Sequence, residues 1–159
     1  MVTLSPALIN FFEKQTFVIV STIDSKKRIH CAAKGIVGID KRGKIYLIDL
    51  YKTTTFRNLQ KNHTVSITAV DEHFFMGYTL KGWARMVARS KIETPLIKKW
   101  EEKVTQRISR RLIKNVKDNR DSRHHPEAKF PRPQYLIEMS VEEVVDLTPP
   151  HLKQESNHL

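Results

Sequence analysis

The sequence has little of several residue types, and each shortage narrows the class of protein. Cys31 is the one cysteine among 159 residues, so no internal disulfide can form and we expect a cytoplasmic protein. No apolar run is long enough to cross a bilayer, and the N-terminus lacks the order of a secretory signal, so we expect no membrane partner. The histidines follow no metal-ligand spacing, which predicts no metal site.

Motifs of covalent catalysis are also missing, since the chain has neither a nucleophile elbow nor a glycine-rich phosphate loop. No catalytic residue can be assigned from the sequence. Any redox or group-transfer chemistry would therefore belong to a bound cofactor, and the protein would supply its orientation and electrostatics.

Positive charge is in excess. The chain has 28 Lys and Arg against 17 Asp and Glu, a formal net charge of +11. Much of this excess lies in residues 107–132, on the polar face of a predicted helix and in the loop after it. Such a balance favours an anionic partner: a phosphorylated cofactor, a nucleic acid or a membrane surface. Nucleic acid is less favoured than a cofactor, because aromatic residues do not alternate with the basic ones.

Hydrophobic periodicity predicts a mainly β (α+β) chain forming one domain over residues 1–159. Strand patterns occupy residues 16–24, 28–40, 44–50, 63–71, 76–90 and 134–149. Ser5 and Pro6 begin a short N-terminal helix, a second helix runs from Thr54 or Thr55 to Asn62, and Thr94 caps a long amphipathic helix. Six strands with little βαβ rhythm predict an antiparallel barrel with flanking helices. Residues 92–132 would be a helix and basic loop insertion, and 150–159 a frayed tail.

One stretch, "DLYKTTTFRNLQKN" at residues 49–62, joins a strand to a helix through three threonines. Helix N-termini offer unpaired N–H groups that bind phosphate, and Lys52 adds a cation. The alternative is that Thr53 or Thr54 simply caps the helix. Lys34, inside the strand run "CAAKGIV", either faces solvent or reaches an anion held at this corner.

The segments taken together resemble the FMN-binding split-barrel superfamily, the pyridoxamine 5′-phosphate oxidase-like proteins. The matching run covers residues 17 to about 88, and "YLIEMSVEEVVDLTP" resembles the closing strand. The resemblance implies a split barrel with FMN between two subunits of a homodimer. It places the phosphate before "NLQKN", and it implies these cofactor-binding residues: Lys34, Leu47, Ile48, Asp49, Lys52, Thr53, Thr54 and Thr55. Trp83 is a candidate for a ring contact from the partner chain.

The family usually has a basic residue at the position of Thr54, and its absence leaves another flavin, a deazaflavin or haem open as the cofactor. We therefore expect a flavin-binding protein, an FMN-dependent oxidoreductase or flavin reductase that uses a small-molecule substrate or a nicotinamide donor. The alternatives are a non-catalytic flavin-binding or redox-sensing module and a basic barrel that binds nucleic acid.

Overall fold

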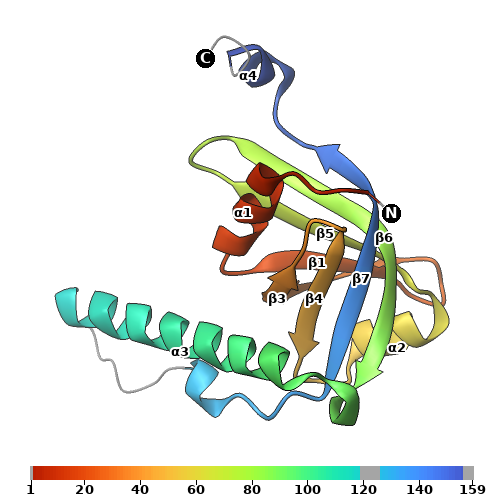
Figure 1. Cartoon of the computed structure of the whole chain (residues 1–159), viewed down its shortest axis with the longest axis vertical. Helices are drawn as coiled ribbons and strands as arrows, with labels where there is room; N and C mark the ends of the chain where they lie inside the picture. The colour runs from red at the N-terminus through yellow and green to blue at the C-terminus, as the bar shows by residue number, and fades with distance from the viewer. Residues whose placement is uncertain (1, 119–125, 156–159) are drawn as a thin grey trace.

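The computed structural model describes residues 2–118 and 126–155. Its seven strands are β1 (Val18–Ile23), β2 (Ile29–Lys34), β3 (Ile36–Ile39), β4 (Lys44–Asp49), β5 (Thr64–Asp71), β6 (Met76–Ala88) and β7 (Tyr135–Asp146). Its helices are α1 (Pro6–Lys14), α2 (Thr54–Lys61), α3 (Thr94–Lys117) and α4 (Pro150–Glu155), with short 3₁₀ turns η1 (Arg89–Lys91) and η2 (Pro126–Lys129). Figure 1 shows their arrangement.

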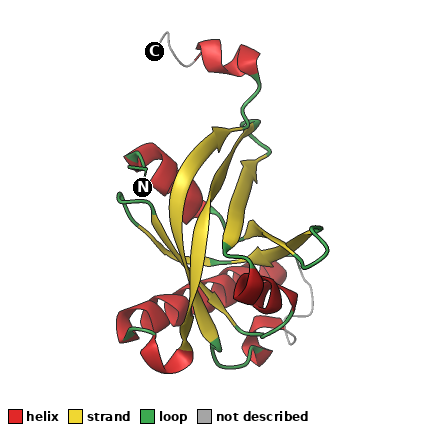
Figure 2. Ribbon diagram, turned by 90° about the vertical axis from the view of Figure 1, so that its right-hand side faces the viewer, coloured by secondary structure: helices red, strands yellow, loops and turns green. Residues whose placement is uncertain are grey.

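The strands form one antiparallel sheet in the order β2-β1-β5-β6-β7-β4-β3. Its two edge strands, β2 and β3, are consecutive in the chain. The sheet curls into a half-barrel (Figure 2), and β2 lies against β4 although the two strands are not hydrogen-bonded neighbours. β6 and β7 pair along most of their length although residues 92–132 lie between them. The predicted fold class, a split antiparallel barrel with flanking helices, is confirmed.

The predicted number of strands needs correction from six to seven. Residues 28–40 read as one strand, but they divide at Gly35 into β2, which pairs with β1, and β3, which pairs with β4. One extended run thus hydrogen-bonds to partners at opposite edges of the sheet, so it must change direction between them. Alternation of apolar residues reports which side chains face the core, and it cannot report which neighbour each half pairs with.

The main core fills the concave side of the sheet. The period-two pattern of β4 and β7 turns Leu47, Ile137 and Met139 inward, and all three side chains are fully buried. α1 adds Phe12, and the predicted N-cap is confirmed because the Leu8 N–H donates to Ser5 Oγ over 3.2 Å. Fully burying an aliphatic or aromatic side chain of this kind stabilises the fold by about 1.5–3 kcal/mol.

A second apolar cluster lies between α3 and the outer face of the sheet. It contains Val37, Ile48, Ile92 and Leu136, and Trp100 of α3 packs against it. The expected Thr94 cap is wrong, because Glu93 is the N-cap residue and makes no side-chain capping bond, while Thr94 is already helical. The structure has no need of that cap, since packing against the sheet stabilises the start of this helix.

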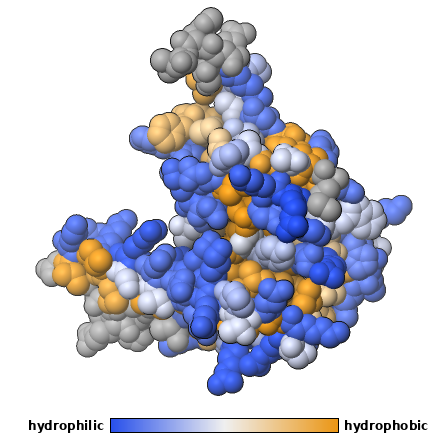
Figure 3. Space-filling view, in the orientation of Figure 1, coloured by the Kyte–Doolittle hydropathy of each residue, from blue (hydrophilic) through white to orange (hydrophobic). Residues whose placement is uncertain are grey.

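The C-terminal half of α3 projects past the sheet (Figure 1). Leu112, Ile113 and Val116 are exposed on this half, and apolar atoms are visible at this end of the helix in the space-filling view (Figure 3). Within the described ranges, no helix combines the length and hydropathy needed to span a lipid bilayer, α3 included.

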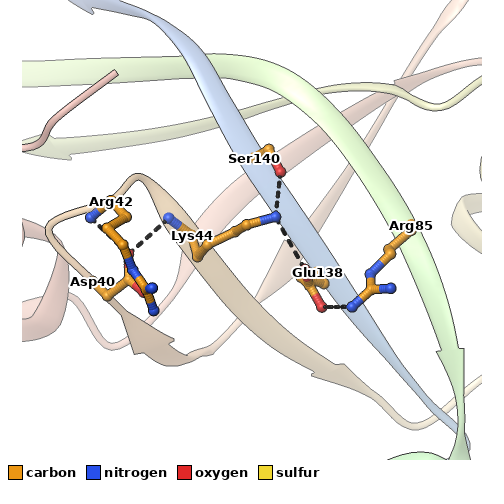
Figure 4. Close-up of polar contacts among 6 residues, drawn as sticks. All are labelled: Asp40, Arg42, Lys44, Arg85, Glu138 and Ser140. Carbon is orange, nitrogen blue, oxygen red and sulfur yellow. Dashed lines mark hydrogen bonds and ion pairs between the residues drawn. The ribbon is translucent and has the colours of Figure 1, made fainter. Parts of the chain in front are cut away.

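Charged side chains also join three strands on the outer face of the sheet (Figure 4). Glu138 of β7 accepts from Lys44 of β4 at 3.1 Å and from Arg85 of β6 at 2.6 Å, and Lys44 also donates to Ser140. Burial works to raise the pKa of Glu138, but the two cations outweigh it and hold this pKa below its usual value. Glu138 therefore remains a carboxylate that ties β4, β7 and β6 together.

The chain ends in residues 150–159, for which the sequence predicts a frayed tail. Residues 150–155 form α4, which begins at Pro150, and Lys153 forms an ion pair with Asp146 at 3.0 Å. Residues 156–159 lie outside the described residues.

Candidate functional site

A cavity of about 360 Å³ opens where β2, the end of β4, the start of α2 and α3 meet. Alternate residues of β2, His30, Ala32 and Lys34, face it, and the small alanines leave room for a ligand. Its other lining residues are Phe17, Ala33, Gly35, Ile36, Ile48, Asp49, Leu50, Tyr51, Thr53, Thr55, Trp100, Lys103, Arg107 and Phe130. A curled sheet is needed to form this cavity, because β2 and β4 are not hydrogen-bonded neighbours.

A buried polar network forms one wall of the cavity. Asp49 and Tyr135 stand opposite each other in the β4–β7 register, and the Tyr135 hydroxyl donates to Asp49 Oδ2 over 2.6 Å. Lys34 reaches across from β2 and forms an ion pair with the same oxygen. The Lys34 and Asp49 side chains are 10% and 8% exposed. Burial, together with the bond to Asp49, raises the pKa of Tyr135, so its hydroxyl stays a proton donor at neutral pH.

The start of α2 forms a second wall. Thr53 is the N-cap residue but makes no side-chain capping bond, so within residues 2–118 and 126–155 no N-cap side chain satisfies the first-turn N–H groups. Thr55 is 1% exposed and lines the cavity, and no hydrogen bond within the described ranges involves its hydroxyl. Leu59 anchors the helix in the core, and Asn58 donates to the Thr22 hydroxyl over 3.0 Å. An uncapped helix start beside a buried hydroxyl is suited to receiving an anion.

α3 contributes two cations from the opposite side. Arg107 Nε donates to the buried Glu127 over 2.8 Å and its guanidinium lies over the Phe17 ring. Lys103 Nζ donates to the Ile36 carbonyl over 2.7 Å and has no carboxylate partner in the part of the chain that the structure describes. Burial lowers the pKa of Lys103. Lys103 is thus the cavity cation whose charge is least compensated by a neighbouring side chain.

This environment predicts a pH-dependent contribution of Lys103 to stability. The pKa of Lys103 is lowered from 10.5 by folding, so unfolding takes up a proton between the lowered pKa and 10.5. The wild type therefore gains stability from this group as pH rises through that interval, and Lys103→Met lacks the gain. Urea unfolding at a series of pH values from neutral to 10.5 measures the difference. Lys98→Met, an exposed position on the same helix, is the control. Parallel pH curves for wild type and Lys103→Met would contradict the assignment.

The structure brings together some of the residues that the sequence singled out. Lys34, Ile48, Asp49, Thr53 and Thr55 all line the cavity. They come from three elements that are separated in the sheet or the chain, so their convergence is a property of the curled fold.

The other three predicted residues lie elsewhere. Leu47 is fully buried in the main core and does not line the cavity. The Lys52 ammonium lies over the Phe56 ring, 5.4 Å from its centroid, and faces a different cavity. The Thr54 hydroxyl accepts from Arg57 over 3.3 Å. Trp83, the candidate for a partner contact, is half-exposed on β6, away from the cavity.

Sequence reasoning missed Tyr135 and Lys103 as site residues, and it placed Arg107 only on a basic helix face. No local signal identifies them, since Tyr135 reads as the first apolar residue of a strand and Lys103 as one of many lysines. Within the basic segment 107–132, residues 119–125 lie outside the described residues, and Arg111 joins Arg107 in pairing with Glu127. Among the described residues, no three His, Cys, Asp or Glu side chains cluster as metal ligands would.

Comparison with solved structures finds the same fold in proteins of low sequence identity. A putative pyridoxamine 5′-phosphate oxidase from Lactobacillus delbrueckii has a TM-score of 0.60 at 15% identity, covering 90% of this chain and 93% of that one. HutZ, the heme storage protein from Vibrio cholerae, has a TM-score of 0.54 at 17% identity, covering 91% and 94%. An F420 reductase has a TM-score of 0.57 at 11% identity, covering 89% and 98%.

At these identities the likeness concerns the fold alone, and no curated protein matches the chain. The family model described as pyridoxamine 5′-phosphate oxidase matches residues 4–145, which include every strand of the half-barrel except the last residue of β7. The chain therefore belongs to the pyridoxamine 5′-phosphate oxidase family.

Proposed function

We propose that the cavity binds FMN and that the protein is a cytoplasmic FMN-dependent oxidoreductase or flavin reductase. The observation that carries this proposal is the meeting of two anion-binding features in one cavity. The uncapped start of α2, with the buried Thr55 hydroxyl, faces the same space as the buried Lys34 ammonium. A terminal phosphate would receive hydrogen bonds from both.

The remaining walls suit an aromatic ring system. Phe17, Trp100 and Phe130 provide apolar surface, and the small residues Ala32 and Gly35 leave room for a ring on the opposite side. A bound flavin would supply the transfer of hydride or electrons. The chain's own residues would hold the phosphate, orient the ring and exclude water, while Lys103 stands at the cavity wall as a cation for an anionic substrate.

The proposal includes a homodimer, which the family resemblance implies. Ile19, Ile29 and Trp83 are exposed on the outer face of the sheet, and burying them against a second copy would remove apolar surface from water. Native mass measured with and without FMN tests this part.

Haem is the second candidate ligand, and one observation favours it. His30 lines the cavity, and imidazole is a common axial ligand of haem iron. A structural neighbour is described as a heme storage protein, and another as an F420 reductase, which keeps a deazaflavin among the alternatives. The visible spectrum of the purified protein separates flavin from haem. Reduction by NADH or NADPH, with product formation, separates an enzyme from a non-catalytic module.

The proposed phosphate site at the start of α2 gives a specific prediction. Thr55→Ala should weaken FMN binding by about 1–3 kcal/mol, because a charged phosphate loses one hydrogen-bond donor. The matched control is Thr54→Ala, whose hydroxyl accepts from Arg57 and does not line the cavity, so FMN affinity should be unchanged. Fluorescence titration with FMN measures both. Equal affinities in wild type and Thr55→Ala would move the phosphate away from the start of α2.

Nucleic acid remains the least favoured partner. Arg110, Lys114 and Lys117 are exposed on α3 and offer a basic surface. Salt-dependent binding of DNA that Glu substitutions at these positions abolish would support this alternative.

A further inference from the structure

We propose that Asp49 sets the phosphate affinity of the cavity by competing with the bound phosphate for the Lys34 ammonium. The inference rests on the proposed function, because it concerns the phosphate end of the same ligand. It makes Asp49 a specificity-determining residue, which distinguishes a phosphorylated flavin from an unphosphorylated one.

The contacts of the Lys34 ammonium are the first evidence for this competition. Its ammonium has three donors, and within the described ranges its one polar partner is Asp49. Both side chains are about nine-tenths buried, and both line the cavity. A phosphate entering the cavity therefore meets a lysine whose charge is already compensated. To gain that lysine as a partner, the phosphate must draw the ammonium away from the carboxylate.

The contacts of the Asp49 carboxylate are the second evidence for this competition. Asp49 Oδ2 accepts from both Lys34 and Tyr135, and Asp49 Oδ1 accepts from the Tyr51 N–H over 3.3 Å. When Lys34 turns toward a phosphate, Asp49 keeps two donors and is not left unsatisfied. The Asp49 carboxylate can therefore lose the Lys34 ammonium and still accept hydrogen bonds from its other two donors. Tyr135 lowers the energetic cost of this exchange, because its hydroxyl donates to the same Asp49 oxygen that Lys34 leaves.

The electrostatics give the direction of the effect. The Asp49 carboxylate is buried in the cavity wall, so water screens its repulsion of a bound phosphate less than it would screen two exposed anions. Asn in place of Asp49 removes the negative charge and the competitor for Lys34 together, while its amide fills nearly the same space. FMN binding should therefore tighten in Asp49→Asn. Riboflavin has no phosphate, so its affinity should change little.

The experiment compares FMN and riboflavin affinities by fluorescence titration in four proteins: wild type, Asp49→Asn, Tyr135→Phe and the double variant Lys34→Met/Asp49→Asn. We expect the ratio of FMN to riboflavin affinity to rise about tenfold or more in Asp49→Asn, as expected for one strong charge interaction. The double variant should lose this gain, since the gain requires the lysine. Tyr135→Phe should lower the ratio severalfold, because Asp49 Oδ2 then depends on Lys34 alone.

Each outcome of these titrations either supports or overturns the inference. A ratio that is unchanged or lower in Asp49→Asn overturns the inference, and so does a gain that persists without Lys34. If Asp49→Asn does not fold, the direction of the Tyr135→Phe effect decides in its place. If the wild type binds neither flavin, the proposed function fails, and inorganic phosphate then serves as the probe. A larger phosphate-induced rise in Tm for Asp49→Asn than for wild type, absent from the double variant, supports the competition, and equal rises overturn it.

Discussion

Gly82→Ala is expected to destabilise the protein by about 3 kcal/mol or more, as overpacking against rigid backbone does. Gly82 lies in β6 where its pairing with β7 shifts register, between Lys81 and Gly82. A Cβ at this position would stand 2.0 Å from the Ser140 carbonyl oxygen and 3.1 Å from the Val141 Cα. Both atoms belong to the main chain of the neighbouring strand, so no side-chain rotation relieves the clash. The pairing of β6 with β7 must open instead.

Urea unfolding of wild type and variant measures this effect. Gly35→Ala is the matched control, because the nearest atoms to its added Cβ are the Arg107 side chain at 3.7 Å and the Thr16 carbonyl at 4.0 Å, which are ordinary contacts. We expect Gly35→Ala to change stability by less than about 1 kcal/mol. If Gly82→Ala were as stable as Gly35→Ala, the close approach of β7 to Gly82 would be wrong.

Lys34→Met is expected to cost about 3–5 kcal/mol, because it leaves the buried Asp49 without its cation. Asp49→Asn leaves Lys34 buried without its anion and should also destabilise the fold. The double variant Lys34→Met/Asp49→Asn removes both charges, so its loss should be smaller than the sum of the two single losses by about 1–3 kcal/mol. This coupling would report the buried ion pair directly.

The matched control is an exposed ion pair on the same sheet. Lys81 and Glu143 pair across β6 and β7 at 3.2 Å, but their side chains are 51% and 58% exposed. Lys81→Met should change stability by no more than about 1 kcal/mol, because solvent screens exposed pairs. Single losses at Lys34 and Asp49 that simply add would show that the two side chains do not interact in the folded protein.

Local sequence rules predicted much of the secondary structure. Ser5 and Pro6 mark the start of α1, and the switch from strand to helix after Asp49 predicted α2 with its end at Asn62. A glycine inside a strand pattern is typical of a bulge, and the β6–β7 pairing shifts register beside Gly82. These features depend on a few neighbouring residues, such as a hydroxyl that caps a helix or a glycine where backbones approach. Short-range signals of this kind are present in the sequence itself.

Local rules failed where a contact partner lies far along the chain. The run 28–40 alternates as one strand, yet Gly35 divides it because its halves pair with β1 and β4. Thr94 looks like a helix cap, but Glu93 takes that position. Lys34 could not be told from a solvent-facing lysine, because its partner Asp49 comes from another strand. Tyr135, from a third strand, donates to the same carboxylate oxygen.

The sequence by itself determined the mainly β class, the places of α1, α2 and α3 among the strand segments, and the threonine-rich corner at the start of α2. The tertiary structure alone decided which charged residues share the cavity. Lys34, Asp49 and Lys103 line it only because the sheet curls and α3 packs beside it, and Tyr135 hydrogen-bonds to Asp49 from β7. The physical reason is the separation along the chain between the groups that interact. Capping and alternation act over a few residues, whereas the compensation of a buried charge depends on groups that folding brings within hydrogen-bond distance.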